Sequence, residues 1–447
     1  MKISELFGAN VPRYTSYPTA PHFHAGIGPA TYEAWLADLP ENAPLSLYVH
    51  IPFCDTLCWF CGCHTAVVNN YAPVLSYCAW LEREIELVAR YLKGRHPVTH
   101  IHWGGGSPTM LQPAQIESLN RTIRGQFDVA ADAEFAIEID PRGLTPACVQ
   151  ALARAGVTRA SIGLQDCDPQ VQRAINRIQS EQETMVAVSL LRAVGITSIN
   201  VDIIYGLPHQ TLAKWETTLD FALSLDPDRL AVFGYAHVPK FKKHQALIPT
   251  ASLPGLEERF HQAELAREIL CGHGYQSIGL DHYAKPSDSL AKAATEGRLH
   301  RNFQGYTTDT STVLLGVGAS AIGSLPQGYI QNHSAVPAYR AALEAGLLPV
   351  TRGVALSDDD RMRRQVIERL MCDLKVDLDD IAVRFGHTRD AFSDSLHALE
   401  PLRQDNVIAM AGGTITVNPR WRSAVRIACA AFDQYLVKQA ALHSASV

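Results

Sequence analysis

Residues 45–63, LSLYVHIPFCDTLCWFCGC, join an apolar run directly to a group of four cysteines. The run LSLYVHI (45–51) has the length and composition of a buried strand. The cysteines follow with the spacing C-x₃-C-x₂-C, and Cys63 comes shortly after them. Loops that follow parallel strands gather at the carboxyl end of the sheet, where active sites lie. This stretch therefore predicts both the first strand of the fold and the centre of its chemistry.

Further strand-like runs alternate with amphipathic helical runs along the chain. Glycines that precede the next strand, such as Gly156 and Gly195, suit helix C-caps. Six strand–helix units predict an α/β fold with a parallel sheet and right-handed crossovers. A closed barrel needs eight units, and the sequence becomes irregular after Gly279, so we predict a partial, open (β/α)6-type barrel. The strands expected after the first are 99–103, 133–139, 158–164, 199–205 and 229–235.

Two regions flank this barrel, which we expect to occupy residues 43–350 with its extension. Residues 1–42 are rich in Pro, Tyr and His without a clear period, and they predict an N-terminal arm that lies over the barrel mouth rather than a mobile tail. Residues 351–447 predict a small, mostly helical domain that starts with a helix capped by Ser357 and includes a hairpin turning at Gly412. Its pattern resembles a winged helix. Because it has no basic recognition helix, we expect this domain to pack against the barrel or cover it rather than bind DNA.

The composition excludes several classes of protein. Of 447 residues, 47% are apolar and 19% charged, and the formal net charge is −6, which disfavours a nucleic-acid binder. No apolar run is long enough to span a membrane, and the first residues lack the apolar core of a secretory signal. We therefore expect a cytoplasmic, monomeric protein whose ten cysteines serve metal or redox chemistry before disulfides.

The cysteine spacing itself points to an iron–sulfur site. Cys54, Cys58 and Cys61 can hold three irons of a [4Fe-4S] cluster and leave the fourth open for chemistry. Structural zinc usually requires a second pair of cysteines, which the sequence lacks, so zinc is the weaker alternative. The remaining cysteines are expected to be small buried hydrophobes; they are Cys78, Cys148, Cys167, Cys271, Cys372 and Cys429.

Polar motifs follow the next strands in the same way. In HWGGGSPT (102–109), three glycines allow a close backbone approach to a ligand and offer free N–H groups. The alternative is a plain tight turn. In AIEIDPRG (136–143), Glu138 and Asp140 share one strand face, so they either meet a cationic or hydroxyl-bearing ligand or point to the surface.

Three more polar residues suggest a second bound ligand. Gln165 and Asp202 are expected at strand ends near the mouth, and Arg177 lies between them in sequence. The alternative for Arg177 is an exposed position on a helix, and the alternative for Asp202 is a role in capping a loop. The loop 299–309, LHRNFQGYTTD, contains Arg301 and is a candidate binding loop, whereas the basic segment 239–245, PKFKKHQ, is expected to be a solvated loop.

Several of these motifs together resemble one enzyme family. They are PRYTSYPTA (12–20), YVHIPFC (48–54), HWGGGSPT, IEIDPR, NVDIIYGLPHQT (200–211) and HRNFQGYTTDT (300–310). With them the chain resembles, almost end to end, the oxygen-independent coproporphyrinogen III oxidases of the radical S-adenosylmethionine (SAM) superfamily.

This resemblance implies a set of site residues. It implies cluster ligation by Cys54, Cys58 and Cys61, with Cys63 as an accessory cysteine, and no classical acid–base pair. It implies a first SAM held by Tyr48, Gly105, Glu138 and Ile322. It implies a second SAM near Phe60, Gly106, Ser107, Gln165, Arg177, Asp202 and Ala236, with serine at position 107 where threonine is expected. From the chemistry of their side chains, Arg13, Tyr14, Tyr17 and Arg301 are candidate substrate contacts.

The resemblance further implies an anaerobic radical decarboxylation. Two propionates of coproporphyrinogen III become vinyl groups, giving protoporphyrinogen IX in haem biosynthesis, with electrons from an unidentified low-potential donor. A haem-binding chaperone of the same superfamily is the nearest alternative. It is disfavoured by Cys63, the arm and the 299–309 loop. A plain iron–sulfur electron carrier is a third reading, which SAM binding would exclude.

Overall fold

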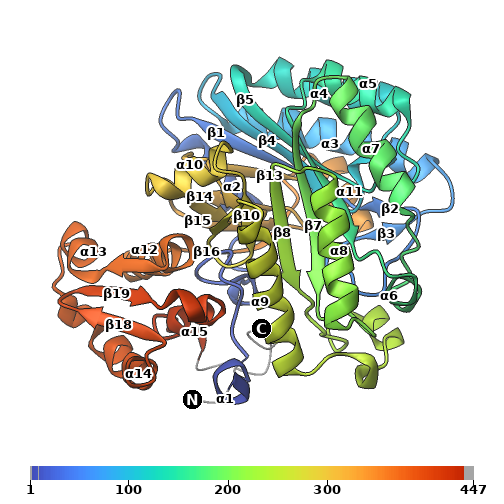
Figure 1. Cartoon of the computed structure of the whole chain (residues 1–447). Helices are drawn as coiled ribbons and strands as arrows, with labels where there is room; N and C mark the ends of the chain where they lie inside the picture. The colour runs from blue at the N-terminus through green and yellow to red at the C-terminus, as the bar shows by residue number, and fades with distance from the viewer. Residues whose placement is uncertain (1–2, 9, 437–447) are drawn as a thin grey trace.

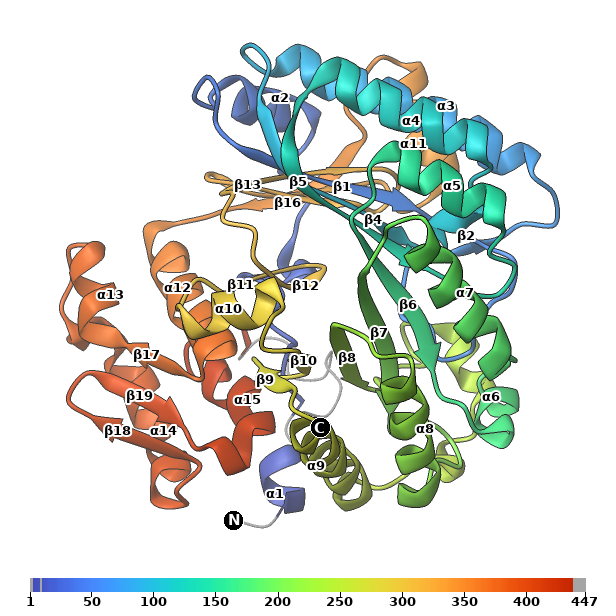
Figure 2. The same cartoon turned by 45° about the horizontal axis from the view of Figure 1, so that its top comes forward.

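The computed structural model describes residues 3–8 and 10–436, with only the backbone described at positions 4 and 5. Its centre is a curved sheet of parallel strands in the order β1–β4–β5–β6–β7–β8, with helices on the outer face (Figures 1 and 2). The strands are β1 (Leu45–Ile51), β4 (Pro97–Gly105), β5 (Asp128–Ile139), β6 (Arg159–Gln165), β7 (Ser198–Tyr205) and β8 (Arg229–Gly234). The helices that follow them are α3 (Ala72–Tyr91), α4 (Pro113–Gln126), α5 (Pro146–Ala155), α7 (Glu181–Ala193), α8 (Leu212–Ser224) and α9 (Leu256–Gly272). The six predicted strand–helix units are thus confirmed.

The irregular sequence after Gly279 extends the sheet at both edges. Strand β13 (Val313–Val317) lies parallel to β1 on the side opposite β4, and β14 (Ile322–Leu325), β15 (Gly328–Asn332) and β16 (Val350–Ala355) continue it antiparallel. At the other edge, β10 (His282–Ala284) and β9 (Gln276–Ile278) pair antiparallel to β8. The edge strands β16 and β9 do not pair with each other, so the barrel is open, as predicted. Because β16 belongs to this sheet, the sheet continues past the expected boundary at residue 350.

Shorter elements fill the connections of the barrel. They are β2 (Phe53–Cys54), β3 (Ala66–Val67), α6 (Pro169–Ala174), α10 (Ser289–Thr295), the β11 (His300–Asn302) and β12 (Gly305–Thr307) hairpin, and α11 (Val336–Glu344). None of the helices within 3–8 and 10–436 is long and apolar enough to cross a membrane.

Alternation along the strands gives the barrel a polar interior. In β1, Val49 is buried in the main hydrophobic core with residues of the outer helices, whereas Ser46 lines an inner cavity of about 130 Å³. The same period of two turns Glu134 and Glu138 of β5 into that cavity. A closed barrel is normally filled by apolar side chains. This lumen instead holds charged and polar groups, which suits a site for polar ligands.

The C-terminal region has the predicted elements. Helix α12 (Asp358–Asp373) starts at Ser357, whose side chain accepts a hydrogen bond from the backbone N–H of Asp360. A three-stranded sheet, β17 (Lys375–Asp377), β19 (Thr414–Val417) and β18 (Ile408–Ala411), packs with α13 (Leu378–Arg384), α14 (Ser393–Gln404) and α15 (Val425–Ala430). Within the described residues, the last α-helix is α15, which ends at Ala430.

The N-terminal arm differs from the prediction of an irregular segment. It contains α1 (Ile3–Phe7) and α2 (Pro29–Ala37). Helix α2 begins with a proline in its first turn, a start signal that is hidden in sequence by the surrounding prolines and histidines. Phe7, Tyr14 and Tyr17 are each at most 3% exposed and belong to the hydrophobic core of the C-terminal domain. The arm is therefore packed between the barrel and this domain, and the mobile-tail alternative is wrong.

Two lone cysteines depart from the expectation of burial. Cys78, Cys148, Cys372 and Cys429 are buried, whereas Cys271 is exposed and Cys167 is half-buried.

Candidate active site

The cysteine loop begins at the carboxyl end of β1 and is held on one side by the segment after α6. The N–H of Trp59 donates to the carbonyl of Ile175 at 2.8 Å, and the Asn176 amide donates to the carbonyl of Leu57 at 2.9 Å. These contacts fix the turn that presents Cys58. The loop geometry therefore depends on residues more than a hundred positions away in the chain.

A second segment, which we call the loop clasp (residues 242–245), binds the other half of the loop. Lys242 donates to the carbonyl of Cys63 and His244 contacts that of Cys61, both at 2.8 Å. The buried Gln245 donates to the carbonyl of Phe60 at 2.9 Å and accepts from the N–H of Val238. The sequence reading of 239–245 as a solvated loop is thus wrong for these side chains. A run of basic residues gives no signal for contacts made with a distant backbone.

The three predicted ligands converge at the barrel mouth. Burial raises the pKa of Cys54 to about 12, and the nearby Cys61 and Cys58 add to the shift. Hydrogen bonding from Cys63 lowers the pKa of Cys61 to about 6, aided by Lys242. Within 3–8 and 10–436, no group of three or more His, Cys, Asp and Glu side chains could hold a single metal ion. Three thiols at the spacing C-x₃-C-x₂-C remain the predicted ligands of a [4Fe-4S] cluster.

Arg177 and Asp140 meet beside the cysteine loop. Arg177 is 6% exposed and lies after α6, so the exposed-helix alternative is wrong. Its guanidinium lies 3.7 Å from the sulfur of Cys58 and 3.1 Å from Asp140, and it donates to the carbonyl of Gly163 at 2.7 Å. Arg142 approaches the same sulfur at 3.8 Å. Two guanidiniums beside one cysteine supply positive charge where a cluster of thiolates would sit.

Glu138 points into the lumen and not to the surface. Its carboxylate lies 3.1 Å from the His102 ring nitrogen and accepts from the N–H of Gly105 at 3.1 Å. Burial alone would raise the pKa of Glu138, but the bonds from His102 and Gly105 outweigh it and lower the pKa. The ionised carboxylate is therefore available for a cationic or hydroxyl-bearing ligand.

The glycine run is required by close packing. A Cβ at Gly104 would lie 2.7 Å from the Glu138 carboxylate, and one at Gly106 would lie 2.6 Å from the Phe53 carbonyl. Gly105 has φ +115°, which favours glycine. Contrary to the sequence expectation, the N–H groups are already used: Gly106 donates to Ile51, and Ser107 donates to Phe53. A ligand with an ammonium group would therefore meet the carbonyls of this run.

His50 is a positioning residue that the sequence analysis missed. Its Nδ1 lies 2.9 Å from the Tyr48 hydroxyl, and its Nε2 lies 3.0 Å from the carbonyl of His64. The ring also comes within 3.3 Å of the Ser320 hydroxyl. It therefore connects β1, the end of the cysteine loop and the turn before β14. Its place within YVHIPFC, on the same strand face as Tyr48, was the available signal.

The residues predicted to bind a second ligand are spread over the barrel lumen and its rim. Asp202 lies in the middle of β7 and accepts from Ser161 and Asn200, each at 2.8 Å, so neither a strand end nor a loop cap describes it. Burial raises its pKa. Gln165 is the last residue of β6, with φ +70°. The others lie near the mouth: Phe60 packs against the cluster that includes Tyr235, Ala236 follows β8, and Ile322 begins β14.

The four substrate candidates are divided between two cavities. Tyr14, Tyr17 and Arg301 line a cavity beside α12, whereas Arg13 lines a separate one and donates to the carbonyl of Gly234 at 2.5 Å. The Tyr14 hydroxyl donates to Asp433 at 3.0 Å, and the Tyr17 hydroxyl accepts from the N–H of Gln434. These contacts hold the arm against the C-terminal domain.

Comparisons with known proteins agree with this architecture. Residues 48–222 match the family model described as the radical SAM superfamily, and residues 356–420 match the HemN C-terminal domain. The chain is 49% identical to an oxygen-independent coproporphyrinogen III oxidase of Bradyrhizobium diazoefficiens, over 98% of this chain and 97% of that one. The Escherichia coli protein of the same name is 42% identical over 100% of this chain and 97% of that one. A solved structure of the E. coli coproporphyrinogen III oxidase (HemN), described as a radical SAM enzyme, superposes with a TM-score of 0.91 at 41% identity, covering 95% of this chain and 98% of that one.

Proposed function

The chain belongs to the family of oxygen-independent coproporphyrinogen III oxidases in the radical SAM superfamily, and from this premise we propose how its residues serve that reaction. The reaction is the anaerobic oxidative decarboxylation of two propionates of coproporphyrinogen III, which gives protoporphyrinogen IX in haem biosynthesis. The observation that carries the assignment of the site is the convergence of Cys54, Cys58 and Cys61 above a polar lumen. Once bound, the [4Fe-4S] cluster and SAM supply the 5′-deoxyadenosyl radical that takes a hydrogen atom from the propionate β-carbon.

The protein's own groups bind and orient these ligands. Cys54, Cys58 and Cys61 would hold the cluster, and the loop clasp keeps the backbone of residues 60–63 in place. The Gly105 carbonyl would meet the SAM ammonium, and Glu138 would meet the ribose hydroxyls or the sulfonium. Tyr48 and Ile322 complete the first SAM site. Cys63 lies beside Cys61 as an accessory group.

A second SAM adjoins the first in this proposal. Arg177 offers a planar donor fork, although its guanidinium already has protein partners. A second SAM would therefore bind the unused N–H groups of the Arg177 guanidinium or displace one of its protein partners. The other groups near it are Phe60, Gly106, Ser107, Gln165, Asp202 and Ala236.

Anaerobic turnover tests the proposal. The reconstituted protein, SAM, dithionite as the low-potential donor and coproporphyrinogen III should give a product with two vinyl groups and 5′-deoxyadenosine. Cleavage of SAM without decarboxylation, together with tight haem binding in a parallel titration, would instead support the chaperone reading. Gel filtration during the same preparation tests the expected monomer.

A further inference from the structure

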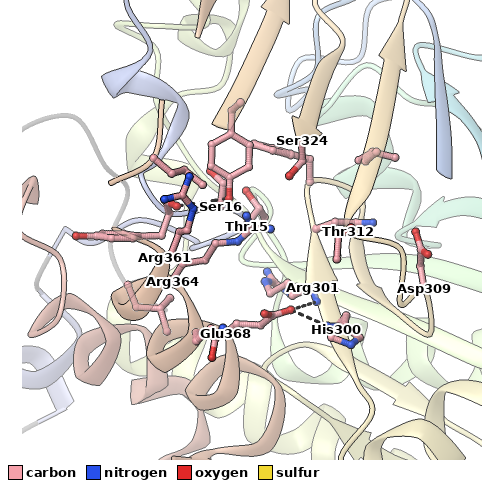
Figure 3. A pocket seen from close by; sticks show the side chains of 18 of the residues that line it. Thr15, Ser16, His300, Arg301, Asp309, Thr312, Ser324, Arg361, Arg364 and Glu368 are labelled. Atoms are coloured by element: carbon pink, nitrogen blue, oxygen red, sulfur yellow. Dashed lines mark hydrogen bonds and ion pairs between the residues drawn. The ribbon is translucent and has the colours of Figure 1, made fainter. Parts of the chain in front are cut away.

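A cavity of about 440 Å³, which we call the α12 pocket, lies between the barrel and the C-terminal domain (Figure 3). Its walls come from the arm, from the segment around β11 and from α12. The lining includes residues 14–17, 300–303 and 309–312, and Arg361, Arg364 and Glu368 of α12. Its volume falls in the range of small-molecule sites, roughly 300–1,000 Å³. Three parts of the chain that are far apart in sequence thus build one ligand-sized space.

Positive charge is in excess in this pocket. Arg301, Arg361 and Arg364 line it, together with His300. The two acidic residues have other partners: Glu368 lies 3.0 Å from the His300 ring, and Asp309 contacts His100 and Ser46. Burial alone would raise the pKa of Glu368, but hydrogen bonding to His300 and the charge of Arg364 outweigh it and lower the pKa. The pocket therefore suits an anionic ligand.

Arg364 has the free donors for such a ligand. Its guanidinium lies 5.2 Å from the centre of the Tyr329 ring, and it forms no hydrogen bond or close ion pair with any residue in 3–8 or 10–436. Arg361, in contrast, pairs with Asp358 at 2.9 Å. A planar guanidinium binds a carboxylate through two parallel bonds. Figure 3 shows Arg364 directed into the space beside Arg301 and Thr15.

The wall against which Arg364 packs is aromatic. Tyr329 stacks on Phe23 with ring centres 5.7 Å apart, and Phe303 meets the same ring edge-on at 5.8 Å. Tyr329, Phe303 and Tyr17 all line the pocket. Aromatic edges combined with guanidiniums suit a large apolar ring that carries carboxylates at its edge, whether planar as in a porphyrin or puckered as in a porphyrinogen.

The pocket lies next to the expected radical source. Ser324 lines it, and Ile322, a predicted contact of the first SAM, stands two residues earlier on the same face of β14. At about 3.3 Å per residue, the two positions are roughly 7 Å apart. Ile322 also packs against the cluster formed by Phe23 and Tyr329. A macrocycle in the pocket could therefore present one edge group toward the SAM site.

We propose that the α12 pocket holds the tetrapyrrole substrate and that Arg364 binds one of its propionate carboxylates. This inference rests on the proposed function, and it assigns to α12 of the C-terminal domain a direct part in substrate binding. Arg361 and Arg301 add positive charge to the pocket, and Tyr329 packs against the Arg364 guanidinium.

The test measures binding of coproporphyrin III, the oxidised and fluorescent form of the substrate, to the holoenzyme under anaerobic conditions. Arg364→Ala should weaken binding roughly tenfold or more, as expected for the loss of a charge-assisted contact, and raise KM for coproporphyrinogen III more than it lowers kcat. Arg364→Lys should restore part of the affinity. SAM affinity and iron content should stay at wild-type values. Arg403→Ala is the matched control, because Arg403 is an exposed arginine of the same domain that pairs with Glu400.

The tetramethyl ester of coproporphyrin III keeps the ring but lacks the carboxylate charges, so its binding shows how much of the affinity depends on those charges. If Arg364 binds a carboxylate, the wild type and Arg364→Ala should bind the ester equally, so the difference seen with the free acid disappears. Wild-type affinity for the free acid in Arg364→Ala would overturn the inference and leave the proposed function intact. A wild-type holoenzyme that neither binds the porphyrin nor decarboxylates coproporphyrinogen III would overturn both.

Discussion

The cysteine loop and the α12 pocket are built in opposite ways. The loop supplies the three predicted cluster ligands from eight consecutive residues, 54–61, and distant segments hold its backbone and approach the Cys58 sulfur. The pocket takes its functional side chains from the arm, from β11 and from α12, and no two of these walls adjoin in sequence. The proposed cofactor site is therefore encoded locally, whereas the proposed substrate site depends on how two domains and the arm pack together.

Cysteine substitutions should have the largest effect and should damage only the loop. Cys54→Ser, Cys58→Ser and Cys61→Ser should each abolish the four-iron cluster and SAM cleavage, since losing one thiolate opens a second iron. Iron and sulfide analysis and electron paramagnetic resonance of the reduced state provide the measurement. Cys148→Ser, a buried cysteine outside the mouth, should bind iron normally. A full iron content in any of the three variants would remove that residue from the ligand set.

Deletion of residues 1–20 should affect the other region. Phe7, Tyr14 and Tyr17 pack in the core of the C-terminal domain, and Tyr14 and Tyr17 also line the α12 pocket. The deletion should therefore abolish decarboxylation while iron content and SAM affinity are kept, because none of the described contacts of the cysteine loop comes from the arm. All three quantities should be measured on one preparation. Normal turnover would make the arm dispensable, and loss of the cluster would mean that the two regions are not independent.

Glu138→Gln should weaken SAM binding without loss of the cluster. A charge-assisted contact contributes ~1.5–3 kcal/mol, so the affinity for SAM should fall roughly tenfold or more. The variant keeps an oxygen for the N–H of Gly105, so the glycine run should stay folded. Equilibrium dialysis with SAM on the iron-loaded protein measures the effect. Unchanged affinity would exclude Glu138 from the SAM contacts.

Gln245→Ala should have the smallest effect of the four, a gradual loss of iron. The change leaves the carbonyl of the half-buried Phe60 and the N–H of the half-buried Val238 without their partner, at a cost below the roughly 1–3 kcal/mol of a fully buried group. Faster release of iron to a chelator would report the loosened loop. Gln245→Glu should release iron at least as fast, because it buries a carboxylate against the carbonyl of Phe60. Lys243→Ala is the control, since its exposed ammonium makes no hydrogen bond with any described residue; an equal effect there would contradict the clasp.

Much of the barrel could be predicted from sequence because its signals are short-range. The period of two in β1 and β5 depends on neighbouring residues, and so do the C-cap at Gly156, which has φ +90°, and the N-cap at Ser357. Helix α2 and the strands β14–β16 escaped prediction. Their stability comes from packing on the sheet edge and not from a strong local pattern.

By itself, the sequence determined the open α/β barrel and the family, and it predicted which cysteines hold the cluster, because strand alternation and thiol spacing are local properties of the chain. The tertiary structure alone decided that Arg177 lies beside Cys58, that residues 242–245 hold the cysteine loop, and that Arg13 and Arg301 line different cavities. It also decided that Arg364 faces a pocket shared with the arm. These relations join residues tens to hundreds of positions apart, and such contacts form only when the domains pack.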